Sequence, residues 1–161
     1  MKAFIICVIV VLVFAACTKT DIQPASKITS ANSTDNLSVI KTHTNYITAH
    51  LWKYQGWYFH YVDQQHKGDP QYIRGALDNL VDLNINRYRF RKNGTYIETQ
   101  GQYRFPGTWY FTDSTATLFV LKHDDGLRDN DSLIFVDNNH FNYITFTHYH
   151  NTIYTELIRV P

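Results

Sequence analysis

Short runs of alternating apolar and polar residues fill the sequence from about Tyr46 to Pro161 and recur at intervals of roughly ten residues. Aromatic and β-branched residues dominate these runs, all three Trp among them, and Asp, Asn, Ser and Gly separate them. This pattern is typical of short antiparallel strands joined by tight turns, which build an up-and-down barrel or a sandwich. The predicted strands lie near 51–62, 86–92, 95–105, 108–112, 116–122, 132–136, 141–149 and 152–160.

The clearest hairpin has Asn93-Gly94 between two alternating segments. Asn-Gly is a strong signal for a two-residue type I′ turn, in which both central residues have positive φ. A two-residue turn fixes the register and places Tyr88, Phe90 and Ile97 on one apolar face. The other face holds the arginines of this segment beside Glu98 as a solvated surface. The expected pairs are Phe90 with Ile97, Tyr88 with Thr99, and Arg89 with Glu98.

Two segments interrupt the alternation. Residues 71–83 are less strand-like and are expected to form a short helix or an irregular crossing. Residues 123–131 form a longer, acidic loop that could bind calcium weakly. The loop lacks the Gly at the sixth position and the final Glu of an EF-hand, so a solvated hairpin loop is the simpler interpretation.

The first 16 residues have the layout of a signal peptide. Lys2 provides a basic start, an apolar run extends from Ala3 to Phe14, and Ala15 and Ala16 precede Cys17. The apolar run is too short to cross a bilayer, which takes about 20 residues. The junction resembles the lipobox of bacterial lipoproteins, whose signal peptidase cuts before a lipidated cysteine. Because the other cysteine, Cys7, lies in the discarded segment, acylation (palmitate) would leave no free thiol in the exported chain.

Residues 17–45 are expected to be the lipidated Cys17 followed by a flexible linker. Of residues 18–45, ten are Ser or Thr, and Pro24 interrupts any helix. Without residues 1–16, basic and acidic side chains balance at 14 each. A neutral chain with no basic tract offers no electrostatic surface for nucleic acid, so we expect no nucleic-acid partner.

Several short motifs recur along the domain: Trp52-Lys53, Tyr88-x-Phe90, Asn93-Gly94-Thr95-Tyr96, Gly107-Thr108-Trp109 and Leu118-Phe119-Val120. They resemble the motifs of the lipocalin-like domains on lipoproteins of Bacteroidetes. The resemblance covers about 50–160 and implies an eight-stranded antiparallel up-and-down barrel over 46–161, which can hold a small ligand. True lipocalins carry Gly two residues before the first-strand Trp, where this chain has His50.

The domain has few residues suited to nucleophilic catalysis, and we expect neither enzymatic activity nor a cofactor. Ser114 and Ser132 are the only serines of the domain, and neither lies in a Gly-x-Ser-x-Gly elbow. His148 and His150 could share one face of a strand and bind zinc. No third ligand has a recognisable spacing, so we interpret them as exposed histidines and expect no metal site.

We favour a non-catalytic lipoprotein of the cell envelope, anchored in the outer membrane of a Gram-negative bacterium, that binds a small apolar or amphipathic ligand inside the barrel. The alternative is an interaction module whose outer aromatic residues contact a glycan or a protein. If the barrel is hollow, five side chains should point inward and line the cavity. They are Tyr88, Phe90, Thr99, Trp109 and Phe111, with Tyr88 and Thr99 supplying polar contacts.

Lipidation at Cys17 can be tested directly. Cys17→Ser removes the thiol that would be acylated, so labelling with a radioactive fatty acid should disappear and the protein should be released from membranes. Normal labelling of this variant would contradict the lipid anchor.

Overall fold

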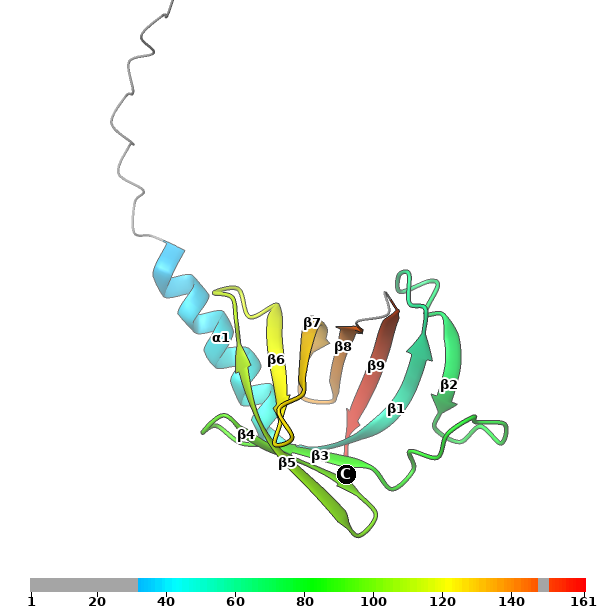
Figure 1. Cartoon of the computed structure of the whole chain (residues 1–161). Coiled ribbons are helices and arrows are strands. Elements are labelled where there is room, and N and C mark those ends of the chain that lie inside the picture. Colours follow the sequence, from blue (N-terminus) through cyan, green and yellow to red (C-terminus); the bar gives the residue numbers. More distant parts are fainter. Residues whose placement is uncertain (1–31, 148–150) are drawn as a thin grey trace, which may run out of the picture. The chain divides into compact units, whose positions relative to one another are not determined.

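The structure, a computed structural model, describes residues 32–147 and 151–161. One helix precedes nine strands in these two ranges (Figure 1). The predicted linker is therefore wrong for residues 32–45, which belong to the helix. The elements are α1 (Asn32–Ala49), β1 (Leu51–Phe59), β2 (Asp69–Ile73), β3 (Arg87–Phe90), β4 (Thr95–Gln100), β5 (Tyr103–Phe111), β6 (Leu118–His123), β7 (Arg128–Val136), β8 (His140–Phe146) and β9 (Thr152–Arg159).

Eight of the strands close an antiparallel barrel. Strands β3 to β9 pair in chain order, and β1 pairs with both β3 and β9. The predicted all-β, eight-stranded, lipocalin-like barrel is confirmed. The remaining strand, β2, was not predicted, and it pairs with β1 along Gly56–Phe59, beyond the part of β1 that pairs with β3.

Two of the differences between the predicted and the observed strand boundaries matter for the site. The chain turns at Gly101, which has a φ of 62°, so 95–105 is not one strand and β5 begins at Tyr103. Strand β7 begins at Arg128, four residues earlier than expected. Asp129 and Asp131 therefore lie on a strand of the barrel wall and not in a solvated loop.

The hairpin register between β3 and β4 is wrong by one residue in the prediction. Of the two turn residues only Gly94 has a positive φ, 79°. The backbone N–H of Arg91 donates a 2.9 Å hydrogen bond to the Thr95 carbonyl, and the N–H of Gly94 donates a 3.1 Å bond to the Arg91 carbonyl. The loop has three residues, as in a type I turn followed by a glycine bulge. A shift of one residue in the pairing moves every side chain of β4 to the face opposite the predicted one. The observed pairs are Phe90 with Tyr96, Arg89 with Ile97, Tyr88 with Glu98, and Arg87 with Thr99.

The end of α1 is tied to the barrel core. The indole Nε1 of Trp52 donates a 2.8 Å hydrogen bond to the carbonyl of Ile47, and both residues are fully buried. This bond satisfies one of the carbonyls that a helix leaves free in its last turn. One turn earlier in the helix, His43 Nδ1 lies 3.1 Å from the carbonyl oxygen of Ala116 in the β5–β6 turn. Tertiary contacts therefore hold α1 in place.

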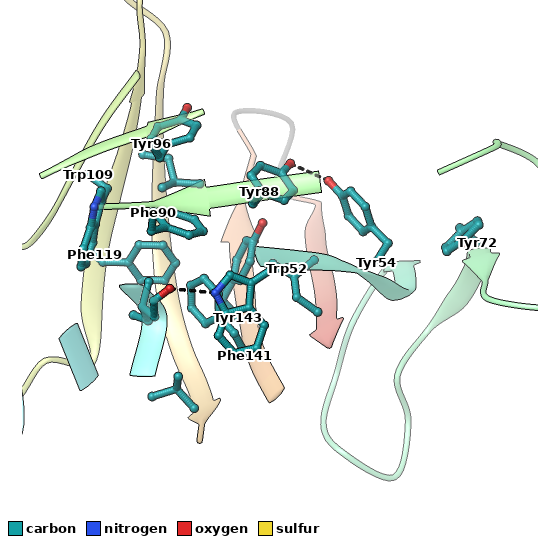
Figure 2. Packing of buried hydrophobic residues seen from close by; sticks show 14 residues of the cluster. Trp52, Tyr54, Tyr72, Tyr88, Phe90, Tyr96, Trp109, Phe119, Phe141 and Tyr143 are labelled. Atoms are coloured by element: carbon teal, nitrogen blue, oxygen red, sulfur yellow. Dashed lines mark hydrogen bonds between the residues drawn. The ribbon is translucent and has the colours of Figure 1, made fainter. Parts of the chain in front are cut away.

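Aromatic rings pack together inside the barrel (Figure 2). Phe90 and Phe141 lie at the centre, with ring centroids 5.5 Å apart. Trp109 meets the edge of Phe90 at 5.7 Å, and Trp52 and Phe119 meet Phe141 at 5.8 and 5.6 Å. The pairs of Phe90 with Phe141, Trp109 with Phe90 and Trp52 with Phe141 are edge to face, and such pairs contribute about 0.5–1.5 kcal/mol each beyond their buried area. We call these five residues the aromatic floor.

The hairpin turn predicts a stability effect for Gly94→Val. A β-branched residue at a φ of 79° is sterically unfavourable, and a Cβ at this position would lie 3.3 Å from the Trp109 carbonyl. The variant should lose about 1–3 kcal/mol of unfolding free energy in urea denaturation. Lys92→Gln at the exposed neighbouring position is the control and should change stability by less than about 0.5 kcal/mol. Equal stabilities for both variants would contradict this account of the turn.

Candidate functional site

The barrel interior also holds a cavity of about 290 Å³, which we call the inner cavity. Its wall includes Tyr54, Trp57, Tyr88, Glu98, Asp129 and Tyr143. An adjoining outer cavity of about 530 Å³ lies between the β4–β5 and β6–β7 hairpins and shares Glu98 and His123 with the inner one. Ligand sites commonly measure about 300–1,000 Å³, so the two spaces together suit a small molecule.

Glu98 reaches the inner cavity because of the register of β4. It lies directly opposite Tyr88 of β3 and Phe105 of β5, on the inner face of the wall. The side chain is 8% exposed, and the amide of Gln100 donates a 2.9 Å hydrogen bond to its Oε1. The prediction that Glu98 pairs with Arg89 on the outer face is wrong because the two residues lie on opposite faces.

His123 connects two polar groups at the mouth of the inner cavity. Its Nε2 lies 3.0 Å from Asp129 Oδ2, and its Nδ1 lies 3.0 Å from the Tyr96 hydroxyl. A neutral imidazole that donates from Nε2 and accepts at Nδ1 satisfies both bonds, with the Tyr96 hydroxyl as donor. The imidazole and the Asp129 carboxylate are 28% and 44% exposed, so this side of the cavity is open to solvent.

Three tyrosines bring their hydroxyl groups to the cavity wall. The hydroxyl oxygens of Tyr54 and Tyr88 are 2.6 Å apart. They share the hydrogen bond drawn between them in Figure 2, and Tyr143 of β8 lines the same cavity. Burial, and then the nearby carboxylate of Glu98, raises the pKa of Tyr54 above its usual range. Burial also raises the pKa of Tyr88 and of Tyr143. All three therefore stay protonated and act as neutral hydrogen-bonding groups.

Asp131 is the most unusual polar residue of the interior. It projects from the inner face of β7, opposite Phe119 of β6 and Thr145 of β8, and is 2% exposed. Thr145, which lines the inner cavity, donates a 2.6 Å hydrogen bond to Asp131 Oδ1. The other oxygen, Oδ2, is buried and has no hydrogen-bond partner among the described residues. Burial raises the pKa of Asp131 to about 8, with a further contribution from Asp129.

The five predicted ligand-contact residues do not gather around one cavity. Tyr88 lines the inner cavity. Phe90 and Trp109 point inward but belong to the aromatic floor, and Phe111 is partly buried against it. The prediction that Thr99 points inward is wrong, because Thr99 pairs with Arg87 on the outer face.

The acidic residues on the inner face of the barrel escaped prediction for two reasons. Glu98 was placed on the wrong face by the one-residue error in register, and Asp129 and Asp131 were assigned to a loop. Alternation could have found the latter pair, since Asp129, Asp131 and Leu133 follow each other at the spacing of one strand face.

Metal binding finds no further support in the described residues. No group of three His, Cys, Asp or Glu side chains among residues 32–147 and 151–161 is arranged to hold a metal ion. The pair His148 and His150 lies outside the described residues, as does Cys17.

Comparisons with protein-family models and with curated proteins find no match for this chain. The fold and the cavity are therefore the basis for inferring its function. Across the described ranges, no helix has the length and apolar character needed to span a membrane.

The raised pKa of Asp131 predicts that the stability of the fold depends on pH. The folded protein keeps a proton on Asp131 up to about pH 8, whereas an unfolded Asp loses it near pH 4. The folded state thus binds more protons in this window, and this residue's contribution to stability falls as pH rises. Asp131→Asn should gain roughly 2–4 kcal/mol relative to wild type between pH 5 and pH 8 in urea unfolding.

Asp78→Asn is the matched control, because Asp78 is exposed and lines neither cavity. It should keep the pH dependence of the wild type. A constant difference in unfolding free energy between Asp131→Asn and wild type across this range would contradict a protonated Asp131.

Proposed function

We propose that this protein is a lipid-anchored lipoprotein whose lipocalin-like barrel binds a small amphipathic ligand in the inner and outer cavities. The observation that carries the proposal is the division of the interior. The rings of the aromatic floor pack against one another, whereas the inner cavity is an open space lined by both aromatic and polar side chains. Sites for small molecules combine these features: apolar walls and a few polar groups that orient the ligand.

The cavity wall favours an amphipathic ligand over a purely apolar one. Tyr54, Tyr88 and Trp57 offer ring surface, while Glu98 and Asp129 would lose hydration if an apolar molecule covered them. Covering a charged group without giving it a partner is costly. A ligand with one apolar part and one polar part satisfies both kinds of wall.

A binding role fits the site better than a catalytic one. The hydrogen-bonded series Tyr96, His123 and Asp129 resembles an acid–base relay in outline. Burial and the nearby Glu98 raise the pKa of Tyr96, so its hydroxyl is a poor nucleophile and its phenolate a rare species. The series is better suited to holding the cavity wall in a fixed shape.

The proposed location follows from the first 17 residues. A signal peptide that ends before Cys17 would place the barrel in the cell envelope, held to the outer membrane of a Gram-negative bacterium by acyl chains. Two or more acyl chains give stable anchoring where one gives marginal binding. Residues 18–31 would then connect the anchor to α1.

Native mass spectrometry of the full-length protein, purified in detergent from its own host, tests the binding function. Ile153 lines the inner cavity, and Ile153→Trp should fill part of it. A bound small molecule should be present with the wild type and absent from this variant. The larger side chain takes the space of the ligand and leaves the aromatic floor unchanged.

Ile158→Trp is the matched control, since Ile158 lies on the same strand and faces outward, opposite Lys53. It should retain the bound molecule. Absence of a bound molecule from the wild type, or equal retention by Ile153→Trp, would contradict the proposed site. The interaction-module alternative would then lead.

A further inference from the structure

Among the described residues, the outer face of strands β3 to β7 carries cations and no carboxylate. Glu98, Asp129 and Asp131 are the acidic residues of these five strands, and all three lie on the inner face. The corrected register of β4 thus removes from the outer face the carboxylate that the sequence had placed among the arginines. The exposed cations of this surface, which we call the basic face, are Arg89, Arg91, Arg104, Lys122 and Arg128.

Two cations of the basic face repel each other across neighbouring strands. Lys122 of β6 lies directly opposite Arg128 of β7, and Thr108 of β5 lies on the other side of Lys122. Like charges at directly opposite positions destabilise a strand pair. An anion outside the barrel that lies over both side chains would remove this repulsion.

The protein supplies no such anion from the part of the chain that the structure describes. In residues 32–147 and 151–161, the ion pair of a Lys or Arg is that of Lys67 with Glu156, away from the basic face. Arg87 also projects from β3, but it donates two 2.7 Å hydrogen bonds to the backbone carbonyls of Asn84 and Asn86. The five cations of the basic face are therefore available to an external partner. The acidic residues next to these strands lie in the turns at their ends, at Asp113, Asp124 and Asp125.

Exposed apolar side chains accompany the cations. Tyr110 of β5 and Leu118 of β6 lie on the same outer face and are 45% and 46% exposed. Tyr is common where proteins meet the headgroup layer of a membrane, because its ring is apolar and its hydroxyl is polar. Cations beside exposed aromatic and aliphatic side chains are typical of surfaces that lie on anionic lipid.

The proposed anchor keeps the domain close to a membrane, and α1 begins beside the strands of the basic face. Near the start of the helix, the amide of Asn36 donates a 3.4 Å hydrogen bond to the hydroxyl of Ser114, in the turn between β5 and β6. Residues 18–31 can span at most about 50 Å when fully extended. An acylated Cys17 would therefore hold the domain within reach of the bilayer surface.

We propose that the basic face docks on the anionic headgroups of the phospholipid bilayer that carries the lipid anchor. This inference rests on the anchor of the proposed function and adds the orientation of the barrel. Each Lys or Arg near an anionic membrane surface favours contact by about fivefold, so several together favour the docked state. Arg104, Lys122 and Arg128 belong to the two hairpins on either side of the outer cavity, so docking holds that cavity beside the headgroup layer.

Energy transfer to vesicle lipids tests the inference with the full-length acylated protein, labelled with a donor dye at one introduced cysteine. Thr108→Cys places the dye on the basic face, and Gln65→Cys places it on the exposed β1–β2 loop, which contacts β9 through Gln64 and Tyr154. The vesicles carry a trace of acceptor-labelled headgroups in phosphatidylcholine, or in equal parts of phosphatidylcholine and phosphatidylglycerol. Transfer from position 108 should rise at least about twofold in the anionic vesicles, and transfer from position 65 should not rise. The rise should disappear in about 1 M salt, where the Debye length is about 3 Å.

Two double variants of equal charge separate the basic face from the net charge of the chain. Arg104→Gln with Lys122→Gln removes two cations of the basic face and should abolish most of the rise in transfer. Lys41→Gln with Arg159→Gln removes two exposed cations on α1 and β9 and should keep the rise. Urea unfolding should give the same stability for both, because all four positions are exposed.

The outcomes distinguish the docking face from the anchor on which it rests. Equal transfer from position 108 in both kinds of vesicle, or equal loss in both double variants, would overturn the docking face and leave the anchor in place. Retention on heparin that only the basic-face variant loses, without any rise in transfer, would also overturn it and assign the face to a soluble polyanion.

The intact mass of the protein from its own host tests the anchor separately. A mass without acyl chains would overturn the anchor, and sedimentation of that protein with the same anionic vesicles would then test the basic face by itself. Binding that Arg104→Gln with Lys122→Gln abolishes would support the face, and absence of binding would overturn it.

Discussion

Closure of the barrel between β1 and β9 is the constraint on which the rest of the structure depends. The pairing extends from Trp52 with Arg159 to Phe59 with Ile153, and it is interrupted by one irregularity between Tyr54 and Gly56. A Cβ at Gly56 would lie 2.5 Å from the ring of Tyr58 and 2.8 Å from Glu156 Oε2, so a larger residue at this irregularity would have to displace these two side chains. Closure pairs both edges of the eight-stranded barrel and leaves β2 at the edge of the sheet. It also brings Trp52 of the first strand against Phe141 of the eighth.

The strands were predictable because alternation is a local property of the sequence. The register of the β3–β4 hairpin was not predictable in the same way. Asn93-Gly94 suits a two-residue turn with two positive φ values, and it also suits a three-residue turn with one. The chain adopts the second, in which Gly94 alone has a positive φ. One residue of difference turns Glu98 inward and Thr99 outward, so the error passed directly into the predicted binding site.

Helix α1 and strand β2 depend on partners that lie far away in the sequence. Residues 32–45 are rich in Ser and Thr, and in isolation they would lose more conformational entropy than they could recover. Their helix is held by Ile47 in the core and by the contact between His43 and the β5–β6 turn. Strand β2 likewise forms on β1, where Tyr72 becomes fully buried and its hydroxyl donates a 2.8 Å hydrogen bond to Asn84.

The packed and the open parts of the interior have opposite effects on stability. A buried carboxyl oxygen without a hydrogen-bond partner, such as Oδ2 of Asp131, destabilises a fold, and an open cavity forfeits packing contacts. The aromatic floor supplies ring-to-ring contacts that offset these costs. A barrel packed throughout in this way would be more stable but would have no space for a ligand. The acidic side chains of Glu98, Asp129 and Asp131 on the inner face are therefore a cost in stability, which the packing of the aromatic rings offsets.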